Sequence, residues 1–228
     1  IAPPLLVTVT DDPKTPFVFD RRMSEDKAAV TLAKIGAKLR RDDAGRIVEV
    51  DLGERQTTDA DLVHLVGLRA LEELSLHQTR ITGAGLVHLK GLTTLKRAFF
   101  SDTAVDDVGV SHLKGLNNLT VLGLSGTRVT DRSLEQLSGL KNLSSLFALE
   151  TKVTDAGLEH LKGLTNLQSL YLWDTKVTDS GLEHLKGLTQ LEMLRLDDTK
   201  VTDEGVKKLQ TAIPICTISR SIQVHPPK

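Results

Sequence analysis

The sequence contains very little of several residue types, and each shortage excludes a class of structure or function. Cys216 is the only cysteine, so the chain can form no internal disulfide and no cysteine-based zinc site. The 29 basic and 30 acidic residues nearly cancel, which leaves no basic excess for nucleic acid or an anionic membrane surface. No apolar run approaches the roughly 18 residues that a membrane-spanning helix needs. We therefore expect no nucleic-acid partner and no membrane insertion.

The same composition leaves the cellular compartment open. A chain that is poor in cysteine is compatible with either side of a membrane. The sequence begins at Ile1 rather than at methionine, which is compatible with a product exported after removal of a signal peptide. A cytoplasmic location is equally compatible with these observations.

A repeat of 24 residues organises most of the chain. Each unit opens with leucine or isoleucine, as in LQSLYLWDTKVTDSGLEHLKGLTQ from Leu167. Eight such units follow one another without an insertion, so one structural unit is expected to stack on the next. The opening positions are Ile47, Leu71, Leu95, Leu119, Leu143, Leu167, Leu191 and Ile215.

Each unit has two halves with different patterns. In the first half the leucines alternate, so Leu170 and Leu172 are expected on the buried side of a strand. The second half has the start and stop signals of a short helix: Thr178 fits the N-cap, Asp179 the first turn and Gly187 the stop. Strand, helix and strand at fixed spacing predict parallel strands joined by right-handed crossovers.

The unit resembles a leucine-rich repeat. Its VTDAGLEHLKGLTNL wording is similar to the ribonuclease-inhibitor-like and F-box-associated branch and to repeat-rich predicted proteins of bacteria. The resemblance covers about residues 46–224. It implies an α/β, right-handed solenoid or horseshoe, with a parallel concave sheet of about eight strands and short helices on the convex side. The family includes receptors, inhibitors and adaptors, so the resemblance is specific for the fold and says little about the function. Threonine stands where the family more often has asparagine, at Thr79, Thr103, Thr127, Thr151, Thr175 and Thr199.

The pattern predicts four segments along the chain. Residues 1–20 are rich in proline and are expected to form an extended arm. Residues 21–45 are expected to form a helical cap, with an amphipathic helix from the N-cap Ser24 to Arg40. The repeats occupy 46–214, and 215–228 form a degenerate last strand and a tail.

Strand alternation also predicts which side chains face outward on the concave sheet. If Leu170 and Leu172 point inward, Tyr171 and Trp173 point out, and four of the seven aromatic residues take such outward positions. Gly123 and Ser125 are small and make the strand between Phe99 and Phe147 low. Two strand spacings predict a notch roughly 10 Å wide there. Residues expected to carry affinity for a partner are Phe99, Phe147, Leu149, Tyr171, Trp173, Met193 and Arg195, and those expected to set charge preference are Asp174, Asp197 and Asp198.

Contiguous apolar patches usually mark a binding surface, so the favoured function is non-catalytic binding of a protein or peptide. Carbohydrate binding on the same face is an alternative, with Tyr171 and Trp173 stacking on sugar rings. A structural or self-associating module, with the patch buried in a homodimer, is another. The aromatic side chains could also fill the inner radius of the sheet, or be covered by the arm that carries Phe17 and Phe19.

Two further rows of residues have the composition of chemical sites. Five histidines recur at one helix position, but duplication of a surface residue explains them better than metal binding. The acidic row after the strands could hold calcium or act in glycoside chemistry. An open ridge leaves its carboxylates solvated, so the row is expected to be an acidic rim that attracts a basic partner. We expect no catalytic residues, no metal and no cofactor. The acidic row is Glu54, Asp102, Glu150, Asp174 and Asp198.

Overall fold

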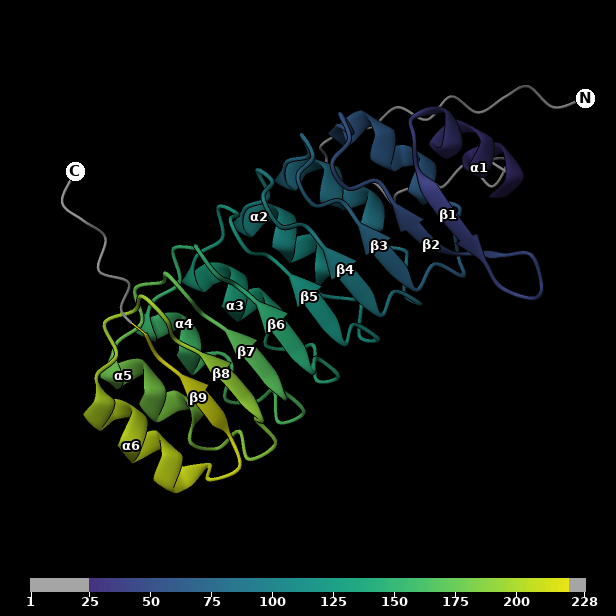
Figure 1. Cartoon of the computed structure of the whole chain (residues 1–228). Coiled ribbons are helices and arrows are strands. Elements are labelled where there is room, and N and C mark those ends of the chain that lie inside the picture. Colours follow the sequence, from purple (N-terminus) through teal and green to yellow (C-terminus); the bar gives the residue numbers. More distant parts are fainter. Residues whose placement is uncertain (1–24, 222–228) are drawn as a thin grey trace, which may run out of the picture.

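The computed structural model describes residues 25–221, which form a solenoid of two layers (Figure 1). One layer is an open sheet of nine strands in chain order, and the other is a row of short helices behind it. Strands β2 to β9 pair in parallel, and β1 pairs antiparallel with β2. The strands are β1 (Lys38–Arg41), β2 (Ile47–Asp51), β3 (Glu73–Ser75), β4 (Arg97–Phe99), β5 (Val121–Gly123), β6 (Ser145–Phe147), β7 (Ser169–Tyr171), β8 (Met193–Arg195) and β9 (Thr217–Ser219).

The helices are short because each unit gives them only about half of its 24 residues. Four of them are 3-10 helices, a tighter form that is common in short pieces. The helices are α1 (Glu25–Lys34), η1 (Asp59–Leu65), η2 (Gly83–Leu89), α2 (Asp107–Val110), η3 (Ser111–Leu113), α3 (Asp131–Leu137), α4 (Asp155–Glu159), α5 (Asp179–Leu182), η4 (Glu183–Leu185) and α6 (Asp203–Ala212).

The core is a stack of leucines placed by the register of the sheet. Leu146, Leu170 and Leu194 lie directly opposite one another on neighbouring strands. All three are 0% exposed, as is the inward Leu172. Since equivalent residues of successive units lie side by side, each unit buries its leucines against the next one.

The N-terminal cap differs from the expectation of one helix from Ser24 to Arg40. Ser24, like the predicted arm 1–20, lies outside the described residues. The helix α1 ends at Lys34, and Gly36 adopts a left-handed φ of +91°, which ends helices at low steric cost. The next residues form β1, where Arg40 lies opposite Glu49 of β2 and forms an ion pair with it at 2.5 Å. The expected length of the helix was therefore wrong, because pairing with β2 competes with local helix propensity.

An aspartate in the first turn of most helices of the repeats also joins neighbouring units. The backbone N–H of Thr178 donates to Asp155 Oδ1 at 2.7 Å, and its hydroxyl donates to Oδ2 at 2.6 Å. These two residues are 23 positions apart, so the aspartate stabilises the N-cap of the following unit as well as its own helix. The same pairing recurs at Asp59–Thr82, Asp107–Thr130, Asp131–Thr154 and Asp179–Thr202.

A glycine in the following helix makes room for this carboxylate. A Cβ on Gly181 would lie 2.4 Å from Asp155 Oδ1 and 3.0 Å from Leu158 Cδ1, so a side chain there would displace the aspartate. In α3 the equivalent position is Ser133, whose hydroxyl donates to Asp107 Oδ1 at 2.5 Å. This position is therefore occupied by glycine, which has no Cβ, or by serine, whose hydroxyl bonds to the carboxylate.

We expect Gly181→Ala to lower the free energy of unfolding by about 2 kcal/mol, because the added methyl group breaks the contacts of Asp155 with Thr178. Gly187→Ala is the matched control, since a Cβ at Gly187 would meet nothing within 4 Å. Urea denaturation of both variants measures the difference. Equal midpoints for the two variants would show that the carboxylate does not need this space.

Candidate functional site on the concave face

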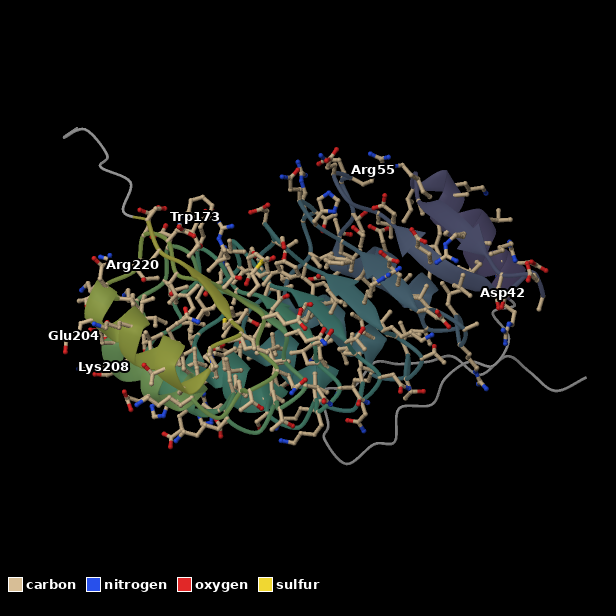
Figure 2. All side chains as sticks on the ribbon, turned by 60° about the horizontal axis from the view of Figure 1, so that its bottom comes forward. Asp42, Arg55, Trp173, Glu204, Lys208 and Arg220 are labelled. Carbon is tan, nitrogen blue, oxygen red and sulfur yellow. The ribbon has the colours of Figure 1, made fainter. Side chains whose placement is uncertain are left out.

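The candidate site lies on the open face of the sheet, which we call the concave face. Phe147, Tyr171 and Arg195 are paired across β6, β7 and β8, and their side chains project from the sheet beside one another. Tyr171 and Trp173 are half-buried, whereas Leu172 between them is 0% exposed. Figure 2 shows Trp173 toward the C-terminal end of the solenoid, far from Arg55 and Asp42.

The apolar side chains of these three strands are in contact. The rings of Phe147 and Tyr171 stack with centroids 4.6 Å apart and planes inclined by 21°. The hydroxyl of Tyr171 donates to Met193 Sδ at 2.9 Å, and Met193 is 37% exposed. The structure thus brings three of the sequence-predicted residues into one continuous surface.

Trp173 is held by a hydrogen bond at its polar edge. Its Nε1–H donates to Asp198 Oδ2 at 2.6 Å, across one unit of the solenoid. Leu149 takes the equivalent position one unit earlier and is half-buried. This bond orients the indole and engages its single hydrogen-bond donor.

The expected notch beside Gly123 is wrong. Gly123 is buried, and a Cβ on it would lie 3.0 Å from Cδ1 of Phe99. The absence of a side chain on β5 lets the Phe99 ring lie against that strand, which fills one side of the gap. Phe99 of β4 thus lies against β5, beside the apolar side chains that β6 to β8 carry on the same face. We call this set of side chains the aromatic band, and it consists of Phe99, Phe147, Leu149, Tyr171, Trp173 and Met193.

The acidic row has a backbone explanation that the sequence did not reveal. Each of its residues directly follows the outward strand positions and adopts a left-handed conformation, with φ of 54° at Glu150, 49° at Asp174 and 55° at Asp198. Side chains with polar groups near the backbone tolerate this conformation better than bulky apolar ones. Glu150 and Asp174 remain exposed beside the aromatic band, whereas Asp198 bonds to Trp173.

Asp197 fastens the last strand to the solenoid. Its carboxylate accepts hydrogen bonds from the backbone N–H and hydroxyl of Ser221, at 2.9 and 2.6 Å, and from the hydroxyl of Ser219 at 2.9 Å. Arg195 Nε adds a contact at 3.1 Å. Burial raises the pKa of Asp197, but these hydrogen bonds outweigh burial and lower the pKa to about 2. With its oxygens engaged by its own chain, this carboxylate is poorly placed to select a partner.

The low pKa of Asp197 predicts a pH-dependent contribution to stability. The unfolded group, with an ordinary pKa of 3.8, binds a proton more readily than the folded one, so the contribution is present above pH 4 and lost as the pH falls toward 2. We expect Asp197→Asn to lower the unfolding free energy by about 2 kcal/mol at pH 7. The difference from wild type, followed by urea denaturation, should shrink below pH 4. A difference that stays constant down to pH 2.5 would contradict this assignment.

A serine and a histidine near the N-terminal end form a cluster that was not predicted from the sequence. His77 Nδ1 lies 2.8 Å from Ser75 Oγ, and its Nε2 lies 3.6 Å from Glu54 Oε1. The Ser75 hydroxyl also hydrogen-bonds the carboxylate of Asp51, which can only accept. The direction of the Ser75–His77 bond depends on the tautomer of the imidazole, so this contact alone does not define an activated serine.

A charged hollow of ≈ 290 Å³ lies at the same end of the sheet. Sequence reasoning missed it because Arg40 was assigned to a helix. Each of its cations faces a carboxylate of its own: Arg40 pairs with Glu49, Lys96 with Glu72, and Arg97 with Glu73. The charges are therefore balanced, and the hollow has no clear preference for an anion. Its lining residues are Arg40, Glu72, Lys96, Arg97 and Thr120.

The side chains and helices of residues 25–221 show neither the features of a metal site nor those of a membrane span. Within that range, no group of three or more histidine, cysteine, aspartate and glutamate side chains could hold a metal ion. No helix in the same range is long and apolar enough to cross a membrane.

The nine strands in chain order, the leucine stack and the short helices define a leucine-rich-repeat fold, as the resemblance of the sequence implied. Comparison with solved structures shows the same fold. Internalin C2 from Listeria monocytogenes has a TM-score of 0.59 at 22% identity, over 85% of this chain and 92% of the internalin. The internalin inlF from that organism has a TM-score of 0.59 at 19% identity, over 77% of this chain.

The chain spans 53% of the inlF structure, about half its length. No family model matches the sequence, and no curated protein matches it. The likeness to the internalins thus establishes the α/β solenoid architecture.

Proposed function

We propose that the chain binds a protein or peptide, without catalysis, through the aromatic band. The observation that carries this proposal is the continuous apolar contact from Phe147 through Tyr171 to Met193 on the open face of the sheet. Leu146, Leu170 and Leu194 already fill the core beneath that face, so the aromatic rings are not needed to pack it. An apolar surface of this kind on a soluble domain usually serves recognition.

The band is organised before any partner arrives. Stacking fixes the rings of Phe147 and Tyr171, and the bond to Asp198 fixes Trp173. Side chains that are already ordered lose little conformational entropy on binding, so more of the contact energy contributes to affinity. Aromatic residues with this property are the usual centres of binding energy at interfaces.

Charge at the borders of the band favours a basic partner. The exposed carboxylates of Glu150 and Asp174 follow Leu149 and Trp173 directly in the chain. Arg195 on β8 is the positively charged residue of this surface, and its side chain is 48% exposed. We assign affinity to the six residues of the band and to Arg195. We assign charge preference to the exposed Asp174 and to the half-buried Asp198.

The proposal is tested by affinity capture with the full chain. Tyr171→Ala/Trp173→Ala should lose the partners that wild type retains. The control variant Val63→Ser/Val108→Ser changes two exposed valines on the convex side and should retain them. Equal capture by all three proteins would rule out the band. Sedimentation velocity and a glycan array on wild type separate the alternatives, because a dimer or a sugar ligand that depends on Tyr171 would replace the proposed partner.

A further inference from the structure

We infer that the occupant of the aromatic band is an amphipathic α-helix that lies across strands β4 to β8 and carries lysine or arginine along one border of its apolar face. The inference rests on the proposed function and deepens it by naming the kind of partner. Three features of the band support it: its length, its lack of available hydrogen-bonding groups, and the charge along one border.

The length of the band matches a short helix. It extends from Phe99 on β4 to Met193 on β8, which spans four strand spacings. At about 4.8 Å per spacing this is roughly 19 Å. A helix rises about 1.5 Å per residue, so about 13 residues, or three to four turns, cover that length. An apolar stripe of this extent comes from residues at i, i+3, i+4, i+7 and i+11.

Backbone groups beneath the band are used by the sheet and by the turns that follow its strands. Leu172 N–H donates to the carbonyl of Arg195 at 2.9 Å, and Ala148 N–H donates to that of Tyr171 at 3.0 Å. The two polar groups within the band are also engaged, since the Tyr171 hydroxyl donates to Met193 and the Trp173 indole donates to Asp198. A partner that covers the band finds few hydrogen-bonding groups there.

This shortage discriminates between conformations of the partner. An extended peptide laid on the band would bury backbone N–H and C=O groups without partners, and each such group costs about 1–3 kcal/mol. A helix satisfies its own backbone groups and presents only side chains to the surface. Because a cost of about 1–3 kcal/mol corresponds to about a 5- to 140-fold change in affinity, even one such group favours the helix by a measurable margin.

The charge pattern fixes which border of the helix is basic. Glu150 and Asp174 are exposed at the end of the strands that carry Leu149 and Trp173. On the opposite border, β6 and β7 begin with the neutral Ser145 and Ser169, and Arg97 at the start of β4 is paired with Glu73. Complementary charge is therefore required along one side of the apolar stripe only.

The inference is tested with two displayed libraries of 14-residue peptides that have equal composition. One library places leucine, phenylalanine and methionine at helical spacing with lysine along one border, and the other alternates the same residues at strand spacing. Both are selected on the immobilised full chain, with Tyr171→Ala/Trp173→Ala as the matched surface. We expect helical-pattern peptides to be enriched at least about tenfold over alternating ones, and circular dichroism to show that they gain helix on binding.

Charge reversal supplies a second readout that folding defects cannot mimic. Glu150→Lys/Asp174→Lys should weaken the lysine-bordered peptides and strengthen the same peptides with glutamate in place of lysine. Preferential enrichment of alternating peptides on wild type would overturn the helix and leave the proposed function intact. Equal enrichment of both libraries on wild type and on Tyr171→Ala/Trp173→Ala would overturn the proposed function as well.

Discussion

Leu170→Ala is expected to lower the free energy of unfolding by about 3 kcal/mol, within the range of about 2–5 kcal/mol that buried leucines show. Leu170 is 0% exposed and lies between Leu146 and Leu194 on the flanking strands. Removing its side chain leaves a cavity between two fixed layers, and the register of the sheet limits how far they can move to close it. Guanidinium denaturation measures the loss.

The neighbouring Ser169→Ala is the control for that experiment. Ser169 is half-buried on the outward side of the same strand, and its replacement should change the unfolding free energy by about 0.5 kcal/mol or less. A solenoid is stabilised by contacts between successive units, so the midpoint of the whole transition should shift in Leu170→Ala. Equal stability of the two variants would mean that strand alternation does not define the core.

Tyr171→Ala/Trp173→Ala is expected to weaken binding of a band-dependent partner by about 100-fold or more. Central aromatic residues at interfaces each cost about 2 kcal/mol or more when truncated, and a total loss above 2.7 kcal/mol corresponds to that factor. The same change removes the stacking on Phe147 and the bond to Asp198, so some loss of stability is also expected.

That loss of stability is separable from the loss of binding. Biolayer interferometry at 15 °C, with folding verified by circular dichroism, reports affinity for the folded fraction alone. Val63→Ser/Val108→Ser, which changes only exposed convex side chains, should bind like wild type. A loss of less than threefold in the aromatic variant would place the binding energy elsewhere.

The period of the sequence predicted the strands and the orientation of their side chains because both depend on local alternation. Leu170 and Leu172 are buried and Tyr171 is not, as a period of two requires. The cap was mispredicted because residues 38–41 become a strand only through pairing with β2, and that contact is not encoded by local propensity. The Asp155–Thr178 bonds were missed for a similar reason, since they join residues 23 positions apart.

The 24-residue repeat pattern could not predict the contacts between outward side chains. Alternation places Phe99 and Trp173 on one face. It does not predict that the Phe99 ring lies against Gly123 or that the Trp173 indole donates to Asp198. The role of Asp197 in holding Ser219 and Ser221 depends on the geometry of the last unit, where the repeat itself is degenerate. These interactions are set by rotamers, which a repeat pattern does not specify.

Trp173 offers the most direct test of the claim that the concave face binds, because it is the only tryptophan in the chain and belongs to the aromatic band. Acrylamide quenching of its fluorescence should be measured in the full chain with and without a saturating, tryptophan-free peptide selected as above. We predict that the quenching constant falls by at least half when the peptide binds. An unchanged quenching constant when the chain is saturated with the peptide would contradict the account.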